Sequence, residues 1–512
     1  MRRLLTALGL LAALLGGVAS AGASPVRVIL WFDTEDYLSP NDDDACLRLA
    51  NLLTERGLRA TFKVVGEKAR VLEQRGRRDV IAALGRHAIG YHANFHSVHP
   101  TPSEYLAECG WLDGVAEFNR REGPGAADVR RIFRVSELAC YGQPGSSWAP
   151  QAIGALAGMA VAPHGVPCYL DDGSQVGLEN RPFWYAGALN VFNLGVNQTR
   201  MDLHDPAALE PAKARVGGIV RRLAAEADGG LISIYYHPCE WIHREFWDGV
   251  NFRRGANPPR EQWRPPPQLT PAETDAAFRQ FAQYLDHLRS LPEIRFVTAA
   301  DLPLIYPDLI RTEGATREEL IRMTRRILAD RASGLDFMVG TKRAFSLADQ
   351  FDALSSVVAA WTTGAELKLP LPIRGLLGPD SPPPTNSTPK AIDGYALRDS
   401  VGDVRNYLAT QGRIPARVMI GAIAVPPADY LVALAAAADE QQPGRAFAPA
   451  DNFPMGRQTV VLPARRIAED SAKVFGGWII HPEGFRAPRI LEQARLQAWT
   501  LKPAQLAPSA NH

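Results

Sequence analysis

The sequence has few cysteines and no excess of charge of either sign. Only five of its 512 residues are cysteines, and no two form a Cys-x-x-Cys pair, which argues against a thiolate zinc site. Lys and Arg number 56 against 55 Asp and Glu, so the formal net charge is +1. This balance gives no electrostatic reason to expect nucleic acid or a charged membrane as a partner. The odd number of cysteines also leaves at least one thiol without a partner in the chain.

The chain also lacks a long apolar run after its first residues. Arg2 and Arg3 precede the apolar run Leu4–Val18, and Ala19-Ser20-Ala21 follows as a small-x-small cleavage site. An apolar core this short that ends in small residues is typical of a signal peptide, which we expect over residues 1–23; an uncleaved signal anchor is the alternative. We therefore expect an exported protein, periplasmic or extracellular, with no transmembrane segment after signal cleavage.

The length of the chain exceeds what one ordinary hydrophobic core supports, so we expect two domains. Across residues 24–305, short apolar runs alternate with amphipathic segments, a pattern that predicts a parallel sheet, here in the form of a barrel. The expected strands are Val28–Phe32, Ala60–Val65, Ala88–Tyr91, Leu189–Leu194, Gly230–Tyr236 and Ile294–Val297, and the expected helices include Asp44–Arg56, Ser103–Arg121, Pro211–Glu226 and Pro271–Leu288. Residues 306–512 have mostly helical spacing, which predicts a mainly α-helical accessory domain.

Three acidic residues directly follow the first expected strand. Val28–Phe32 is apolar, and the chain continues as Asp33-Thr34-Glu35-Asp36. Carboxylates placed side by side at the end of a buried strand need a cation or a proton to compensate their charge. A metal site would supply this compensation. The alternative is that the acids cap the N-terminus of the following helix.

Three of the eleven histidines fall within eight positions, directly after the third expected strand. His92 and His96 are four residues apart, and His99 follows three residues later. Imidazoles at such spacings can bind one divalent cation from a helical turn or a tight loop. Asp33, His92 and His237 all lie at the C-terminal ends of expected strands, where reactive groups of parallel α/β folds collect. The two clusters together predict a metal-dependent hydrolase, although each histidine taken alone has a structural interpretation.

Three motifs resemble those of a known family. Phe32-Asp33-Thr34-Glu35-Asp36, Arg59-Ala60-Thr61-Phe62-Lys63-Val64-Val65-Gly66 and Gly90-Tyr91-His92-Ala93-Asn94-Phe95-His96 resemble, in order and spacing, the opening motifs of the polysaccharide deacetylase (NodB-like) family of carbohydrate esterases. The resemblance covers residues 26–302 and is most specific in the first hundred residues. It implies a distorted (β/α) barrel that removes N- or O-acetyl groups from glycans with one bound divalent metal ion, often zinc.

The resemblance also implies roles for individual residues. Asp33 would be the general base that activates water, and His92 and His96 match the metal-binding His-x-x-x-His pair. His237 matches the late histidine that protonates the leaving amine or alkoxide.

The third metal ligand is less well defined by the resemblance. The family usually has a ligand aspartate directly after the base, whereas this chain has Thr34 there. Asp36 and Glu35 are then the candidates, and we favour Asp36.

The middle motif of the family, Arg-x-Pro-x-Gly, is altered in this chain. The corresponding stretch, Ala139–Trp148, has no arginine to orient the base. Tyr141 and Trp148 in this stretch, and Trp184 further on, are candidates for substrate binding because aromatic faces stack on sugar rings. The alternative for each is a place in the hydrophobic core.

The leading functional hypothesis is a secreted, metal-dependent deacetylase that acts on a carbohydrate polymer or oligosaccharide. One alternative is hydrolysis of a non-peptide C–N bond in a small molecule, which closure of the cleft by the loop Asn251–Gln268 would favour. The other is a catalytically inactive glycan-binding module of the cell envelope, which the missing arginine would favour. The oligomeric state is left open.

Overall fold

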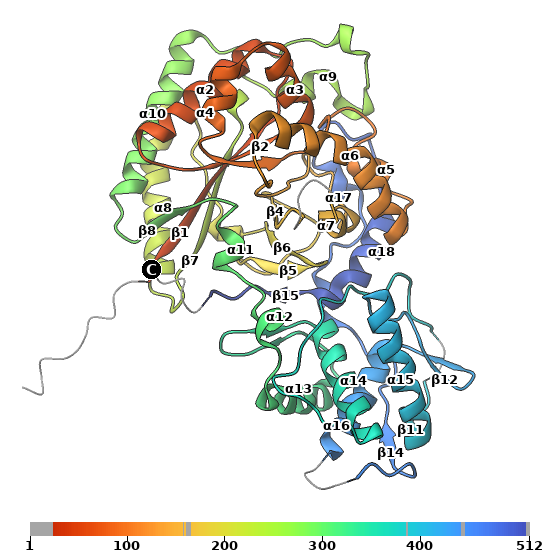
Figure 1. Ribbon diagram of the computed structural model, residues 1–512. Coiled ribbons are helices and arrows are strands. Elements are labelled where there is room, and N and C mark those ends of the chain that lie inside the picture. The colour runs from red at the N-terminus through yellow and green to blue at the C-terminus, as the bar shows by residue number, and fades with distance from the viewer. Residues whose placement is uncertain (1–23, 157, 160–164, 386–387, 442–445, 508–512) are drawn as a thin grey trace, which may run out of the picture.

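The structure of the protein is a computed structural model. It describes residues 24–156, 158–159, 165–385, 388–441 and 446–507. The expected signal peptide, residues 1–23, lies outside these ranges. Figure 1 shows a mixed α/β unit that contains the parallel sheet and, beside it, a mainly helical unit. In the described ranges, no helix combines the length and the apolar character needed to cross a membrane.

The strand β1 (Val26–Thr34) is the centre of the parallel sheet. It pairs along most of its length with β7 (Gly230–Tyr236), through its first residues with β8 (Ile294–Val297), and through its last residues with β2 (Thr61–Val64). Beyond β2 lies β3 (Ala88–Tyr91), also parallel. All nine residues of β1 are buried. Parallel sheets are covered on both faces, which explains the nearly continuous apolar runs that predict these strands.

Helices pack around the sheet (Figure 1). They are α2 (Pro40–Glu55), α3 (Gly66–Gln74), α4 (Arg78–Leu84), α5 (Pro102–Tyr105), α6 (Trp111–Phe133), α7 (Pro150–Leu156), α8 (Leu209–Ala224), α9 (Trp247–Asn251) and α10 (Pro271–Ser290). The prediction of one helix over Ser103–Arg121 is wrong, because the helix is interrupted between α5 and α6. Gly110 takes the N-cap position of α6. The start of α10 follows the sequence rules, since Thr270 accepts a hydrogen bond from the Glu273 backbone N–H in a capping box.

The sheet continues beyond β3 through short segments. Four further strands pair with one another: β4 (Cys168–Leu170) is parallel to β6 (Ala188–Val191), whereas β5 (Phe183–Tyr185) is antiparallel to both β6 and β15 (Lys502–Pro503). Tyr141 forms parallel bridges to Tyr91 at the end of β3 and to Tyr169 in β4, and so joins the two parts. The fold is therefore α/β with a parallel sheet. Among the described residues no strand pairing closes the sheet, so the barrel remains a prediction.

The mainly helical unit has a hydrophobic core of its own. After α11 (Leu302–Ile305) come α12 (Leu309–Glu313), α13 (Arg317–Asp330), α14 (Leu347–Thr363), α15 (Gly394–Gln411) and α16 (Pro427–Glu440), with the short strands β9 (Met338–Val339), β10 (Ala344–Phe345), β11 (Ala391–Asp393), β12 (Val418–Ile420), β13 (Ile423–Val425) and β14 (Asn452–Pro454). α14 and α16 are buried over most of their surface and form the centre of this core. Helices with apolar residues on nearly all sides are expected at such a position.

The last part of the chain returns to the α/β unit. It contains α17 (Ala472–Gly476), α18 (Pro488–Gln497) and β15, which pairs with β5. Ile490, Leu491 and Ala494 of α18 belong to the same core as the central sheet. The expected boundary, with all of residues 306–512 in one accessory domain, does not match this packing. Helical spacing indicates that this region is helical, but periodicity does not say against which core the apolar face of a helix is buried.

None of the five cysteines forms a disulfide: Cys46, Cys109, Cys140, Cys168 and Cys239 are all free thiols. Four of them are buried, and burial raises the pKa of Cys140 to about 12. A thiol that stays protonated at neutral pH is a poor nucleophile and a poor metal ligand. The cysteines therefore act here as small core residues.

A buried ion cluster fixes the start of α2 against α3. The Lys68 Nζ atom lies 2.7 Å from Asp42 Oδ2 and 2.6 Å from Asp43 Oδ1, and it donates a hydrogen bond of 2.7 Å to the carbonyl oxygen of Asp36. Burial raises the pKa of Asp42 to about 6, although the charge of Lys68 opposes this rise. Without Lys68, the Asp42 carboxylate would lose its counter-charge inside the protein.

We expect Lys68→Met to destabilise the protein by about 3–5 kcal/mol, the usual cost of removing one partner from a buried ion pair. Urea unfolding followed by circular dichroism measures this loss. The matched control is Lys213→Met, because Lys213 pairs with the largely exposed Glu210 and its loss should cost less than about 1 kcal/mol. Equal shifts of the unfolding midpoint in the two variants would contradict a structural role for the cluster.

Candidate functional site

The candidate functional residues gather at one edge of the parallel sheet. β3, β2, β1 and β7 are neighbours that run in the same direction, so their carboxyl ends lie at the same edge. Asp33 lies near the end of β1 and Glu35 just beyond it, while His92 follows β3 and His237 follows β7. Residues from three distant parts of the sequence thus meet at the edge where parallel α/β folds place their reactive groups.

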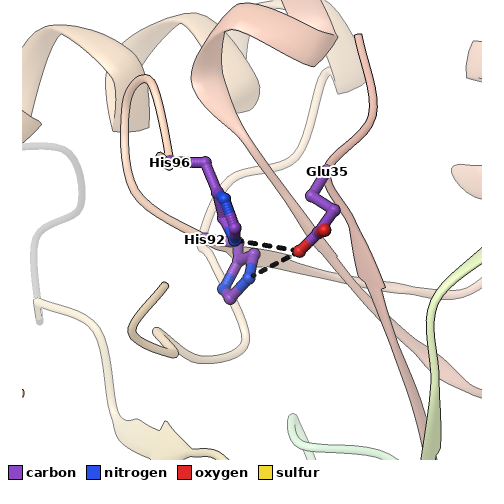
Figure 2. Close-up of side chains that lie close together, drawn as sticks. All are labelled: Glu35, His92 and His96. Carbon is purple, nitrogen blue, oxygen red and sulfur yellow. Dashed lines mark ion pairs between the residues drawn. The ribbon is translucent and has the colours of Figure 1, made fainter. Parts of the chain in front are cut away.

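Glu35, His92 and His96 form a cluster suited to a metal ion (Figure 2). Each offers one ligand atom, and the three atoms lie within 4.8 Å of one another. The Oε2 atom of Glu35 is 2.9 Å from His96 Nε2 and 3.6 Å from His92 Nε2. All three residues are buried. Two imidazole nitrogens and one carboxylate oxygen are a ligand set that zinc takes in catalytic sites, where water or substrate completes the coordination.

The rings of the two histidines are held by their other nitrogen atoms. His92 Nδ1 donates a hydrogen bond of 3.0 Å to the carbonyl oxygen of Gly142, which leaves Nε2 free as a ligand. His96 Nδ1 lies 2.5 Å from the Ser97 hydroxyl oxygen. His96 has a left-handed backbone (φ 56°), which is uncommon for a residue other than glycine. The pair therefore lies in a tight loop rather than on a helix.

The neighbouring groups set the protonation states of Glu35 and His92 in this buried cluster. Burial alone would raise the pKa of Glu35, but the charge of His96 and hydrogen bonds from both histidines lower it well below its ordinary value. Burial lowers the pKa of His92, so this imidazole is neutral at pH 7. An ionised carboxylate and a neutral imidazole are the forms that bind a metal ion.

Asp36 does not lie in this cluster, although the sequence analysis favoured it over Glu35 as the third ligand. Its Oδ1 atom accepts hydrogen bonds from the backbone N–H groups of Leu38 (2.8 Å) and Ser39 (3.1 Å), and its Oδ2 atom is 3.4 Å from His243 Nδ1. In an extended chain, side chains alternate between two sides, so residues two apart point the same way. Asp33 and Glu35 therefore share a side, and Asp36 points to the turn before α2.

Asp33 is paired with a lysine to which the sequence analysis gave no role. Lys63 on β2 is the register partner of Asp33, and its Nζ atom lies 2.9 Å from Asp33 Oδ1 and 3.2 Å from Asp171 Oδ2. Burial lowers the pKa of Lys63, but the charges of Asp171 and Asp33 raise it above its ordinary value. Lys63 is therefore a cation, and it lies beside Asp33. The sequence signal was a lysine inside an otherwise apolar strand.

His237 is held by a carboxylate that the sequence analysis also missed. Its Nδ1 atom is 2.8 Å from Glu240 Oε1, which leaves Nε2 directed toward Asp33 Oδ2, 3.7 Å away. Glu240 in turn pairs with Arg200. Burial lowers the pKa of His237, but the hydrogen bond of Glu240 and the charges of Glu35, Glu240 and Asp33 outweigh it and raise this pKa to about 9. The imidazole is therefore a protonated acid at neutral pH.

These groups line one cavity of about 560 Å³. Asp33, Glu35, His92, His96 and His237 all contribute to its wall. Its aromatic lining consists of Tyr235, Phe246 and Trp478, and the last of these comes from the segment that returns from the helical unit.

The three aromatic residues proposed from the sequence as substrate-binding do not line this cavity. Tyr141 and Trp148 are fully buried in the core. The Tyr141 ring packs edge-on against Phe118 and Tyr169. Trp184 lies in β5, packed on another part of the core. The expectation that these residues bind substrate is therefore corrected to a place in the hydrophobic core. The position of an aromatic residue in a motif does not tell whether its side chain faces the core or the cavity.

Comparison with known proteins gives only distant similarities. No model of a protein family matches the sequence. No curated protein matches it either. Among solved structures, the chain is similar to a family 4 carbohydrate esterase from Streptomyces lividans in complex with acetate, with 14% identity, coverage of 54% of this chain and 92% of that one, and a TM-score of 0.27.

Two further structures show similarity of the same order. A peptidoglycan deacetylase from Bacillus subtilis has 12% identity, with coverage of 55% of this chain and 91% of that one and a TM-score of 0.27. An allantoinase has 11% identity, with coverage of 55% and 90% and a TM-score of 0.35. The function proposed below therefore depends on the geometry of the site.

Proposed function

We propose that this protein is an exported, metal-dependent hydrolase that removes acetyl groups from an acylated carbohydrate. The observation that carries the proposal is one cavity in which the cluster of Glu35, His92 and His96 lies beside Asp33 and His237. A ligand set, a base and an acid are the parts that metal-assisted hydrolysis requires. The sequence motifs that resemble the polysaccharide deacetylase family lend further support.

The metal ion would be held by Glu35, His92 and His96. Their donor set fits zinc, because all three are buried, their ligand atoms lie within 4.8 Å of one another, and Glu35 is ionised while His92 is neutral. Burial lowers the pKa of His96, but the charge and hydrogen bond of Glu35 outweigh this and raise it, so a metal ion would displace a proton from this imidazole. A bound divalent ion supplies a Lewis acid that activates water and polarises a carbonyl oxygen.

The chain's own residues would carry the proton transfers. Asp33 would accept a proton from the attacking water, and the ammonium of Lys63 holds this carboxylate in place at 2.9 Å. His237 would give the proton on Nε2 to the leaving amine or alkoxide, while Glu240 fixes Nδ1 and stabilises the imidazolium. Both groups line the cavity that contains the metal ligands, and His237 Nε2 lies 3.7 Å from Asp33 Oδ2.

The structure bears differently on the two alternatives. An inactive glycan-binding module was suggested by the missing arginine, and Lys63 supplies a cation beside Asp33 instead. A small-molecule hydrolase was linked to closure by the loop Asn251–Gln268, of which only Arg253 contributes to the described cavity lining. Phe246 and Ile479, 37% and 44% exposed, also line the cavity. The pairing of Lys63 with Asp33 supports an active enzyme, and the partly exposed lining residues support a substrate that extends beyond the cavity.

The proposal is tested by metal content and acetate release in the same preparations. We expect the protein from residue 24 onward to bind about one zinc ion per chain and to release acetate from acetylated chito-oligosaccharides or acetylated xylan. The double variant His92→Ala/His96→Ala should lose both properties and keep its fold, as judged by circular dichroism. Metal in neither protein after zinc is added back would overturn the proposed site. Metal without acetate release would overturn the proposed reaction.

A further inference from the structure

The segment 472–481, called here the return segment, borders the candidate active site although it follows the helical unit in sequence. It is held by hydrogen bonds from the α/β unit. Ser146 Oγ donates to the carbonyl oxygen of Phe475 (2.7 Å), and Gln175 Nε2 donates to that of Val474 (3.1 Å). Backbone N–H groups of the loop after α9 donate to the carbonyl oxygens of residues 479 and 480. The return segment is thus fixed on both sides of the site.

Trp478 of the return segment has a well-defined position between the metal ligands and the loop after Tyr141. Its Nε1 atom donates a hydrogen bond of 2.9 Å to Asp248 Oδ2, and its ring lies edge-on to His96 with centroids 5.4 Å apart. The other side of the ring touches Gly145, where a Cβ atom would lie 2.2 Å from the indole and where φ is +47°. Only glycine permits this close approach.

A second cavity, of about 400 Å³, adjoins the cavity that contains the metal ligands. The two share the lining residues Gln143, Gly145, Asp172, Gly477 and Trp478. The remaining lining of the second cavity is mostly small or neutral polar: Ser146, Gly173, Ser174, Gln175, Asn193 and Val474. Both volumes lie in the range of about 300–1,000 Å³ that is usual for ligand pockets.

The chemistry of the second cavity fits a neutral sugar ring. Hydroxyl and amide groups can donate to and accept from sugar hydroxyls, and the part of the Trp478 side chain that lines this cavity adds apolar surface for ring C–H groups. Among the described residues no lysine, arginine or histidine lines this cavity, and Asp172 adds a carboxylate to it, so nothing there would compensate a phosphate or sulfate group.

We propose that Trp478 divides two adjoining subsites, so that the substrate is an oligosaccharide whose acylated unit enters the metal cavity while the neighbouring unit occupies the second cavity. This inference rests on the proposed function and goes beyond it, because it makes the return segment part of the substrate site. It also makes chain length, rather than the acyl group alone, a determinant of specificity.

The experiment fills the second cavity from Gly173. A Cβ atom added there would meet only Asn193 Oδ1, at 3.5 Å, and the backbone is not in the left-handed region, so Gly173→Ala is compatible with the fold and Gly173→Leu extends the side chain from the same position. The matched control is Gly402→Leu, on an exposed face of α15 where an added Cβ meets nothing within 4 Å. Circular dichroism and zinc content verify that each variant is folded and loaded.

We expect Gly173→Leu to lower kcat/KM for acetylated tetrasaccharides, tested in both the chito and the xylo series, at least about tenfold more than for the single acetylated sugar. Gly173→Ala should have a smaller effect in the same direction, and Gly402→Leu none. Equal changes for tetramer and single sugar, or no change in either, would overturn the second subsite while leaving the deacetylase function intact.

Calorimetric binding separates failure of this inference from failure of the proposed function. If no acetate is released from any substrate, the proposed function fails, and titration of the zinc-loaded protein with the same sugars still decides the second subsite. Tighter binding of the tetramer than of the single sugar, weakened in Gly173→Leu, would support it. Equal binding of both sugars, or binding of neither, would overturn it.

Discussion

Glu35→Gln should lose its metal ion, whereas Asp36→Asn should keep it. Each change removes one negative charge from neighbouring acidic residues with almost no change of shape. Of these two acids, only Glu35 has an oxygen atom within reach of both His92 and His96. Residues that merely orient a metal ligand change affinity about 10–100-fold, so loss of a ligand itself should exceed about 100-fold. Zinc affinity measured by competition with a chromophoric chelator gives both values.

Asp36→Asn is the matched control, because an amide oxygen can still accept the hydrogen bonds from the backbone of Leu38 and Ser39. Acetate release should follow zinc content and fall below detection only in Glu35→Gln. Loss of zinc in Asp36→Asn, with retention in Glu35→Gln, would show that the third ligand is the one that the sequence favoured. It would also mean that the turn before α2 rearranges when metal binds.

The choice between these two acids illustrates what limits a prediction of the site from sequence. The motif positions were enough to place Asp33, His92 and His237 at the ends of parallel strands, because that edge is fixed by topology. The side on which each carboxylate points depends on where extended backbone ends, and Asp36 already belongs to the following turn. A strict alternation starting from Asp33 would have selected Glu35.

Partners that lie far apart in sequence were beyond the reach of local patterns. Lys63 lies in a quoted motif, yet its pairing with both Asp33 and Asp171 depends on strand register and on a later loop. Glu240 is three residues from His237, a spacing that suggests a contact only once the short helix after β7 is known. A charged residue within an apolar stretch of sequence is the remaining signal of such a pair, because a buried charge needs a partner of opposite charge.

The same distinction applies to the fold. β7 and β8 were predicted with their bounds. β7 is mostly buried, and a buried parallel strand consists of a nearly continuous run of apolar residues. β4 and β5, three residues each, leave no such signature. α18 packs on the core of the α/β unit, which its sequence alone does not indicate, because its apolar face could pack on either unit. The pairing of β15 with β5 keeps the end of the chain at the α/β unit. Trp478 reaches the site only because the chain returns to this unit.

His237→Gln should lower kcat for amide substrates by about 100–10,000-fold, the usual contribution of a general acid, with zinc content unchanged. The effect should be much smaller for 4-nitrophenyl acetate, because nitrophenolate leaves without a proton. A purely structural role for His237 would reduce both reactions alike. Parallel losses for the acetylated sugar amide and the aryl ester would therefore contradict the assignment of this residue as the acid.

Glu240→Gln provides a graded test of the same assignment through pH. The neighbouring carboxylate helps to raise the pKa of His237 to about 9, so the acid form persists through neutral pH and is lost as pH rises further. Removing the charge of Glu240 lowers this pKa, and the alkaline limb of kcat/KM for amide substrates should move to lower pH. Glu226→Gln, at an exposed residue just beyond the end of α8, should leave the profile unchanged. An alkaline limb that stays in place in Glu240→Gln would show that the group titrating there is not His237.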